Sequence, residues 1–122
     1  MADYLSVQSS PLGTLKYVES SATATVTADF LGPGTTVFSV KIDCTANTGE
    51  AVYLKVWNTA GTPTVGTTAP TLIFHCPAGG VMEYFLLDGF GATAAHVAVV
   101  REAGTAGTTA PSGTVAYTIM GS

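Results

Sequence analysis

Hydrophobic and polar residues alternate with a period of two along much of the chain, which is the pattern of β-strands with one buried face. Three segments show it most clearly, with the apolar series Ala24, Val26, Ala28 and Phe30, then Phe38, Val40, Ile42 and Cys44, then Val52, Leu54 and Val56. Shorter strands are predicted over residues 71–76, 81–87, 94–101 and 115–120. The pattern therefore predicts seven strands, with residues 14–18 as a candidate eighth.

Turn-forming residues separate these strands, as in Gly32-Pro33-Gly34, Asn47-Thr48-Gly49 and Ala78-Gly79-Gly80. Longer loops rich in Gly and Thr occupy residues 59–70 and 102–113. No stretch carries a helical period, and short strands at this spacing are typical of sandwiches and barrels. We predict an all-β fold, an antiparallel β-sandwich or jelly roll of seven to eight strands, which 122 residues can build as one domain.

Residues 1–20 precede the alternating pattern and are predicted to form an extended N-terminal arm, with the β-sandwich domain over 21–122. The arm carries the apolar residues Tyr4, Leu5, Val7, Leu12 and Leu15, which are too few to form a core of their own. Ordering a residue costs about 1–2 kcal/mol in backbone entropy. We therefore expect the arm to become ordered only on a partner surface, where Tyr4, Leu5, Val7 and Leu12 would dock.

The composition is poor in charge. Charged residues make up 10% of the chain, against about 25% in an average soluble domain, so Thr, Ser, Ala and apolar groups must cover the surface. Such surfaces are typical of proteins that assemble. The four cations are scattered and the net charge is −4, which argues against a nucleic-acid partner. No apolar run reaches the ~20 residues of a membrane span, and no signal peptide precedes the domain, so we expect synthesis in a cytoplasm.

Candidate catalytic and metal-binding residues do not form a recognisable motif. His75 and His96 lack zinc-ligand spacing relative to the cysteines, and neither a nucleophile elbow nor a phosphate-binding loop is present. We therefore expect no enzyme activity, no cofactor and no metal. Cys44 and Cys76 are in phase with the core positions, and they are either bonded or buried thiols; a reducing cytoplasm favours thiols.

Two strands carry apolar groups on both faces. Tyr53 and Trp57 lie opposite Val52, Leu54 and Val56 and are predicted to form an exposed aromatic stripe, unless the opposite phase is the buried one. Exposed aromatic residues stack sugars or build protein interfaces.

In residues 81–87, Val81, Phe85 and Leu87 alternate with a second apolar set, Met82, Tyr84 and Leu86. A sandwich strand normally has one wet face, so the second set is predicted to bury against a neighbouring subunit of a homo-oligomer, with a trimer as the expected state. Burial of this set beneath the N-terminal arm of the same chain is the alternative.

One five-residue sequence occurs twice, as Gly66-Thr67-Thr68-Ala69-Pro70 and as Gly107-Thr108-Thr109-Ala110-Pro111. Proline before a strand is a common boundary device, which by itself accounts for the recurrence. The other interpretation is that the two loops are structurally equivalent and lie at one end of the sandwich.

Several short motifs carry a resemblance to known proteins: Tyr53-Leu54-Lys55-Val56-Trp57-Asn58, Pro63-Thr64-Val65-Gly66-Thr67, Ala69-Pro70, Pro77-Ala78-Gly79-Gly80 and Gly89-Phe90-Gly91. Over about residues 51–120 the chain resembles a recurrent group of small proteins encoded by tailed bacteriophages. The resemblance implies a β-sandwich virion component, with no catalytic residues to carry over. We expect a capsid decoration (cement) protein on the outer surface of the head that binds between major capsid protein subunits. The alternative is a tail or fibre accessory subunit or a carbohydrate-binding (receptor-binding) module.

Overall fold

The computed structural model describes residues 3–7, 15–28, 30–32 and 34–122, with side chains from residue 15 onward. These residues form eight strands and no helix, and hence no helix long and apolar enough to cross a membrane. The strands are β1 (Asp3–Val7), β2 (Leu15–Glu19), β3 (Thr35–Asp43), β4 (Val52–Asn58), β5 (Leu72–Cys76), β6 (Val81–Ala92), β7 (Ala95–Val100) and β8 (Ala116–Gly121).

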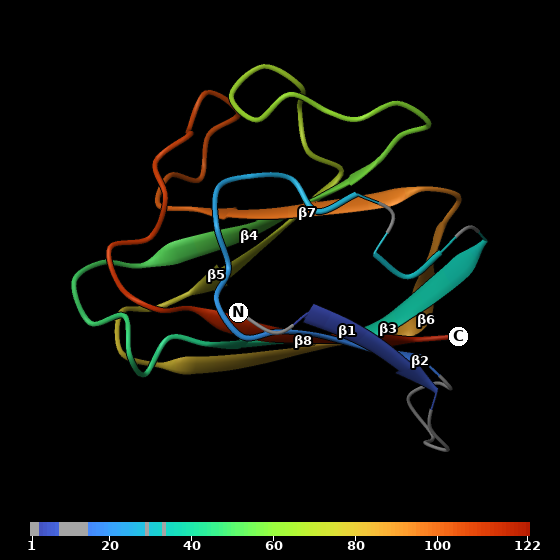
Figure 1. Cartoon of the computed structure of the whole chain (residues 1–122), viewed down its shortest axis with the longest axis horizontal. Helices are drawn as coiled ribbons and strands as arrows, with labels where there is room; N and C mark the ends of the chain where they lie inside the picture. The colour runs from blue at the N-terminus through green and yellow to red at the C-terminus, as the bar shows by residue number, and fades with distance from the viewer. Residues whose placement is uncertain (1–2, 8–14, 29, 33) are drawn as a thin grey trace.

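The strands form two antiparallel sheets that pack face to face. Sheet A has the order β1-β2-β8-β3-β6, and sheet B has the order β5-β4-β7. Figure 1 shows sheet B stacked above sheet A, with the long loops on the far side of sheet B. The predicted all-β sandwich is therefore confirmed, whereas the jelly-roll connectivity stays a prediction.

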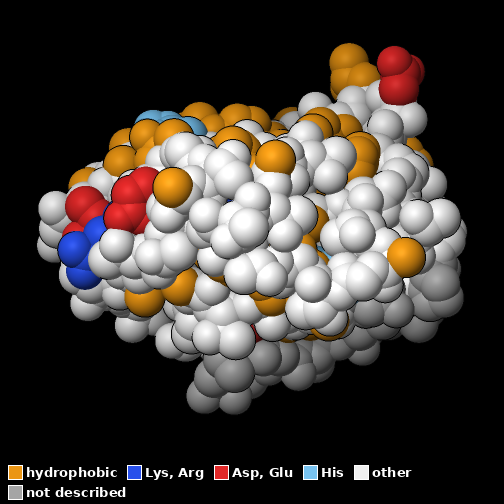
Figure 2. Space-filling model, turned by 90° about the horizontal axis from the view of Figure 1, so that it is seen from above, with side chains coloured by type: hydrophobic (Ala, Val, Ile, Leu, Met, Phe, Trp, Pro, Cys, Tyr) orange, Lys and Arg blue, Asp and Glu red, His pale blue; other side chains and the backbone are white. Residues whose placement is uncertain are grey.

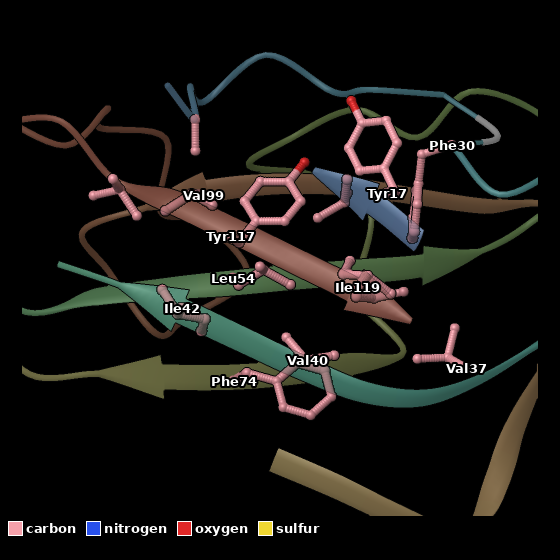
Figure 3. Packing of buried hydrophobic residues seen from close by; sticks show 14 of the residues in the cluster. Tyr17, Phe30, Val37, Val40, Ile42, Leu54, Phe74, Val99, Tyr117 and Ile119 are labelled. Carbon is pink, nitrogen blue, oxygen red and sulfur yellow. The ribbon is translucent and has the colours of Figure 1, made fainter. Parts of the chain in front are cut away.

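The core lies between the two sheets, as Figure 3 shows for ten labelled side chains. Val40, Ile42 and Ile119 enter it from sheet A and are at most 1% exposed. Leu54 and Val99 enter it from sheet B and are fully buried. The predicted inward phase of Val52, Leu54 and Val56 is thus confirmed, and each such side chain contributes about 1.5–3 kcal/mol through burial.

The N-terminal residues belong to sheet A. β1 pairs with β2, and β2 pairs with β8, so residues 3–7 and 15–19 are strands of the sandwich instead of a separate arm. Tyr17 explains this placement, because its side chain is buried and its ring lies 5.4 Å from Phe30 and 6.1 Å from Tyr117, measured between ring centroids.

The structure describes no side chain of the residues predicted to dock the arm. Leu12 lies outside the described residues. Tyr4, Leu5 and Val7 lie in β1, of which the backbone alone is described. Their docking role stays a prediction.

The first predicted strand, over residues 22–30, is not a regular strand. Its described residues run beside β7, where Thr27 forms a bridge with Val97 and the Val99 N–H donates to the Thr23 carbonyl at 3.0 Å, and the Ala22 N–H donates to the Val115 carbonyl at 2.7 Å. The hydroxyl of Thr23 accepts a bond from the Thr25 N–H at 3.2 Å. Such local side-chain bonds compete with the hydrogen bonds of a strand ladder. This competition explains why the alternating pattern wrongly predicted a strand here.

A β-bulge changes the phase of β3. The pairing of β3 with both neighbours shifts register between Val37 and Ser39. Val37 is therefore buried and Phe38 half-buried, which is the reverse of the predicted assignment. Val40 and Ile42, beyond the bulge, keep the predicted inward direction, because a bulge adds one residue to one strand and reverses the alternation on one side of it.

Candidate interaction surface

The chain's own loops cover the middle of the outer face of sheet B. Trp57 is 1% exposed, and its indole Nε1 donates to the Thr68 carbonyl oxygen at 2.8 Å. Lys55 is equally buried, and its Nζ donates to the carbonyl oxygen of Gly104 at 2.5 Å. The predicted exposed stripe is therefore wrong at Trp57, because loops 59–70 and 102–113 cover this face. Tyr53 is half-buried, and its ring lies 5.3 Å from that of His75.

The two copies of the repeated sequence touch each other. Gly66 has φ +94, and a Cβ atom on it would lie 2.5 Å from Thr108 Cγ2 in the other copy. Glycine is therefore needed at this crossing of the loops, both for its backbone conformation and for the space. Figure 2 looks onto the face with these loops, which is mostly white because backbone and uncharged polar side chains form it.

Acidic side chains fasten the second loop to the sandwich. The Ser112 hydroxyl donates to Glu50 Oε1 at 2.6 Å, and the Thr109 N–H donates to Glu102 Oε1 at 3.1 Å. The bonds from Ser112 hold the pKa of Glu50 below its ordinary value, and those from Thr109 do the same to the pKa of Glu102. Beneath this loop, burial lowers the pKa of Lys55. These groups thus have structural roles, as they hold the loop in place.

Apolar side chains are exposed on β6, which is an edge strand of sheet A. Val81 is 46%, Phe85 53% and Leu87 94% exposed. We call these three residues the β6 strip. Apolar side chains also gather along one edge of the molecule in Figure 2. An edge strand with exposed apolar groups is a surface that proteins usually cover.

The second apolar set of this strand faces the other way from our prediction. Met82, Tyr84 and Leu86 are half-buried and pack against the core of the same chain. The reason is the register, because Met82 pairs with Ile42 and Tyr84 with Val40, and directly paired residues point to the same side of a sheet. The prediction that Met82, Tyr84 and Leu86 face a neighbouring subunit is therefore wrong, and the outward set is the β6 strip.

Leu87 owes its exposure to an irregular stretch of β6. Phe85 pairs with Ser39 and Phe90 with Val37, so residues 86–89 lie opposite a single residue of β3. Gly89 has φ +74 within this stretch, and a Cβ atom on it would lie 2.4 Å from Thr36 Cγ2. The extra residues carry Leu87 outward from the sheet, as an apolar side chain almost completely in solvent.

On the outer face of sheet A, by contrast, Lys41 and Glu83 are exposed. Thr118 pairs with Val18 and Lys41, and Lys41 also pairs with Glu83, so these side chains form one row across the sheet. A shallow depression lies along this row; its lining residues are Val18, Lys41, Asp43, Ala116, Tyr117 and Thr118. This face is therefore mixed in character, with the cations Lys16 and Lys41 and the carboxylates of Asp43 and Glu83 next to the β6 strip.

Among the described residues, no three His, Cys, Asp or Glu side chains converge on a point that could hold a metal ion. His96 is buried, and its Nε2 lies 2.9 Å from the Thr59 carbonyl oxygen. Cys44 and Cys76 are free thiols with no exposed surface. Burial, together with the neighbouring thiol of Cys76, raises the pKa of Cys44 to about 12.

We compared the chain with protein-family models, with curated proteins and with solved structures, and none of them matches.

Proposed function

We propose that this protein is a structural virion protein, a capsid decoration protein that binds the outer surface of a phage head between major capsid protein subunits and stabilises the shell. The observation that carries the proposal is the contrast between the two outer faces. Loops of the chain cover Lys55 and Trp57 on sheet B and leave Ile73 as the one exposed large apolar side chain described on that sheet, whereas the three residues of the β6 strip are exposed together at the edge of sheet A. The bacteriophage context comes from the resemblance of residues 51–120 alone.

The β6 strip has enough apolar surface for weak docking by a single subunit. The exposed parts of Val81, Phe85 and Leu87 together equal about two whole side chains. At 1.5–3 kcal/mol for each fully covered side chain, covering them would contribute roughly 3–6 kcal/mol. Association costs a comparable amount, so one contact binds weakly. Subunits that bind both the shell and one another, as in the homotrimer we expect, would bind more tightly through multivalency.

The proposal can be tested with particles that lack the protein. We expect the wild-type protein to co-sediment with such particles and to raise the temperature at which they release their contents. At least tenfold more Leu87→Lys protein should be needed for the same co-sedimentation and the same rise in release temperature. Ile73→Lys is the matched control, because Ile73 is 45% exposed but lies on β5 in sheet B. Equal binding by wild-type and Leu87→Lys proteins, or no binding by either, would refute the proposal.

The second candidate function is that of a tail or fibre accessory subunit or a carbohydrate-binding (receptor-binding) module. The observation in its favour is the ring pair of Tyr53 and His75, beside the exposed Ile73 on the same outer face. Trp57 cannot stack a sugar because the loop that contains Thr68 covers it. A glycan array separates the candidates: binding that Tyr53→Ala abolishes would favour this function, and no binding to host-surface glycans would eliminate it.

A further inference from the structure

The connection from β5 to β6 brings the two cysteines together where the sheets join. β5 belongs to sheet B and ends at Cys76, and β6 begins in sheet A after four intervening residues. The first residue of β6, Val81, pairs with Asp43 at the end of β3. Cys44 directly follows Asp43. Cys76, before the turn, and Cys44, after β3, therefore lie at the same end of the sandwich.

Hydrogen bonds fix both cysteines on one carbonyl group. The Cys44 N–H donates to the Gly80 carbonyl oxygen at 2.8 Å, and Cys76 Sγ lies 3.5 Å from the same oxygen. Cys76 Sγ also lies 3.6 Å from the carbonyl oxygen of Ile42. The thiol of Cys76 neighbours that of Cys44 and contributes to its raised pKa, and neither cysteine has exposed surface. Both cysteines thus lie around the Gly80 carbonyl group, Cys76 at the end of β5 and Cys44 directly after β3. An S–S bond of about 2.05 Å here would join the two sheets.

We propose that Cys44 and Cys76 are a modification site: they form an intramolecular disulfide that links sheet A to sheet B when the chain meets a low-molecular-weight disulfide such as oxidised glutathione. The thiolate of one cysteine attacks the glutathione disulfide, forms a mixed disulfide and releases one glutathione thiol. The thiolate of the other cysteine then attacks the mixed disulfide and releases the second. Two cysteine thiols are oxidised and one glutathione disulfide is reduced, and the two cysteine protons end on the released thiols. This inference does not depend on the proposed function.

Burial sets when this reaction can occur. The thiolate is the attacking species, and an oxidant must reach it. Both sulfur atoms are enclosed in the folded protein, so oxidation requires this end of the sandwich to open. We therefore expect slow oxidation of the folded protein and fast oxidation of a chain that is still folding. Once formed, the bond closes a loop that contains β4 and β5 and restrains the unfolded chain.

The test uses reduced full-length protein and oxidised glutathione in two arms, one native and one refolding from denaturant. In the refolding arm the intact mass should fall by two hydrogens. The thermal midpoint should rise by roughly 5–15 °C and return after reduction. Trypsin cleavage after Lys41, Lys55 and Arg101 places the cysteines in different peptides, 42–55 and 56–101, so a non-reduced digest should contain these two peptides linked.

The controls are Cys44→Ala and Cys76→Ala, which should each accept one glutathione and show no linked peptides and no rise in midpoint. Because a buried alanine substitution could impair folding, the decisive measurement is the peptide map of the wild-type chain. Two stable glutathione adducts, two free thiols after refolding, or a disulfide between two chains would each overturn the proposal.

Discussion

The burial of Trp57 under loop 59–70 gives the most direct test of the structure, because it is the single tryptophan in the chain. Trp57→Phe removes the donor to the Thr68 carbonyl oxygen and shortens a side chain that is 1% exposed. An unsatisfied buried acceptor costs about 1–3 kcal/mol, and the lost ring atoms add about 1 kcal/mol at the usual value for a buried methylene. Thr68 is half-buried, so water can partly replace the donor.

We therefore expect Trp57→Phe to lower the free energy of unfolding by about 2–3 kcal/mol, or the thermal midpoint by roughly 6–15 °C for a domain of this size. Urea unfolding followed by far-ultraviolet circular dichroism measures the change without the tryptophan signal. In the wild-type protein, acrylamide should quench the Trp57 fluorescence poorly.

Tyr53→Phe is the matched control, because it keeps the half-buried ring beside His75 on the same strand. It should change stability by less than about 0.5 kcal/mol. If Trp57→Phe is equally neutral, or if acrylamide quenches wild-type Trp57 as readily as a free tryptophan, the loop does not cover sheet B as described.

Three further predictions concern exposed and titrating groups. Wild-type protein should associate in sedimentation and Leu87→Lys should not, with unchanged circular dichroism because Leu87 is 94% exposed; a monomeric wild type at micromolar concentration would contradict self-association. Burial lowers the pKa of Lys55 below 10.5 in the folded protein. Between the folded-state pKa and 10.5 the unfolded chain binds more protons, so the free energy of unfolding rises with pH over this range. Urea unfolding at neutral pH and near pH 10.5 should show that Lys55→Met lacks this rise. Hydrogen bonds from Ser112 lower the pKa of Glu50 below 4.5, so the ionised Glu50 stabilises the fold above pH 4.5, and this stabilisation is lost as the pH falls through the folded-state pKa. Glu50→Gln should therefore be less stable than wild type at neutral pH and equal to it in acid. A difference in stability that does not change with pH would refute this role.

The alternating pattern correctly predicted the side-chain directions of strands that pair with their neighbours without a bulge. Residues 52–57 and 71–76 have the predicted direction of their side chains, and both cysteines lie in the core. The pattern failed at Phe38, because a bulge inserts a residue without any local signal in the sequence. It also failed at residues 22–28, where the Thr23 hydroxyl accepts a backbone bond from the Thr25 N–H that competes with strand pairing.

The exposed surface was harder to predict than the strands. A period of two separates the two faces of a strand, but it does not show whether the second face meets water. Lys55 is covered by Gly104, a residue 49 positions away, and nothing local in the sequence predicts that contact. For β6 both faces are apolar, so the direction depends on the register with β3, which places Tyr84 inward and Phe85 outward. The identity of the interaction surface therefore required the three-dimensional structure.

The position of β8 has a consequence for how the chain folds during synthesis. β8 follows all the other described strands in the sequence, yet it is the middle strand of sheet A, between β2 and β3. The ribosome releases β4, β5 and β7 before β8, so sheet B can assemble while the two halves of sheet A still lack the strand that joins them. Such a partial chain exposes the apolar inner face of β3 and is prone to aggregate. Chains that stop before Ala116 should therefore be degraded, and complete sandwiches should arise only after the last strand has been made.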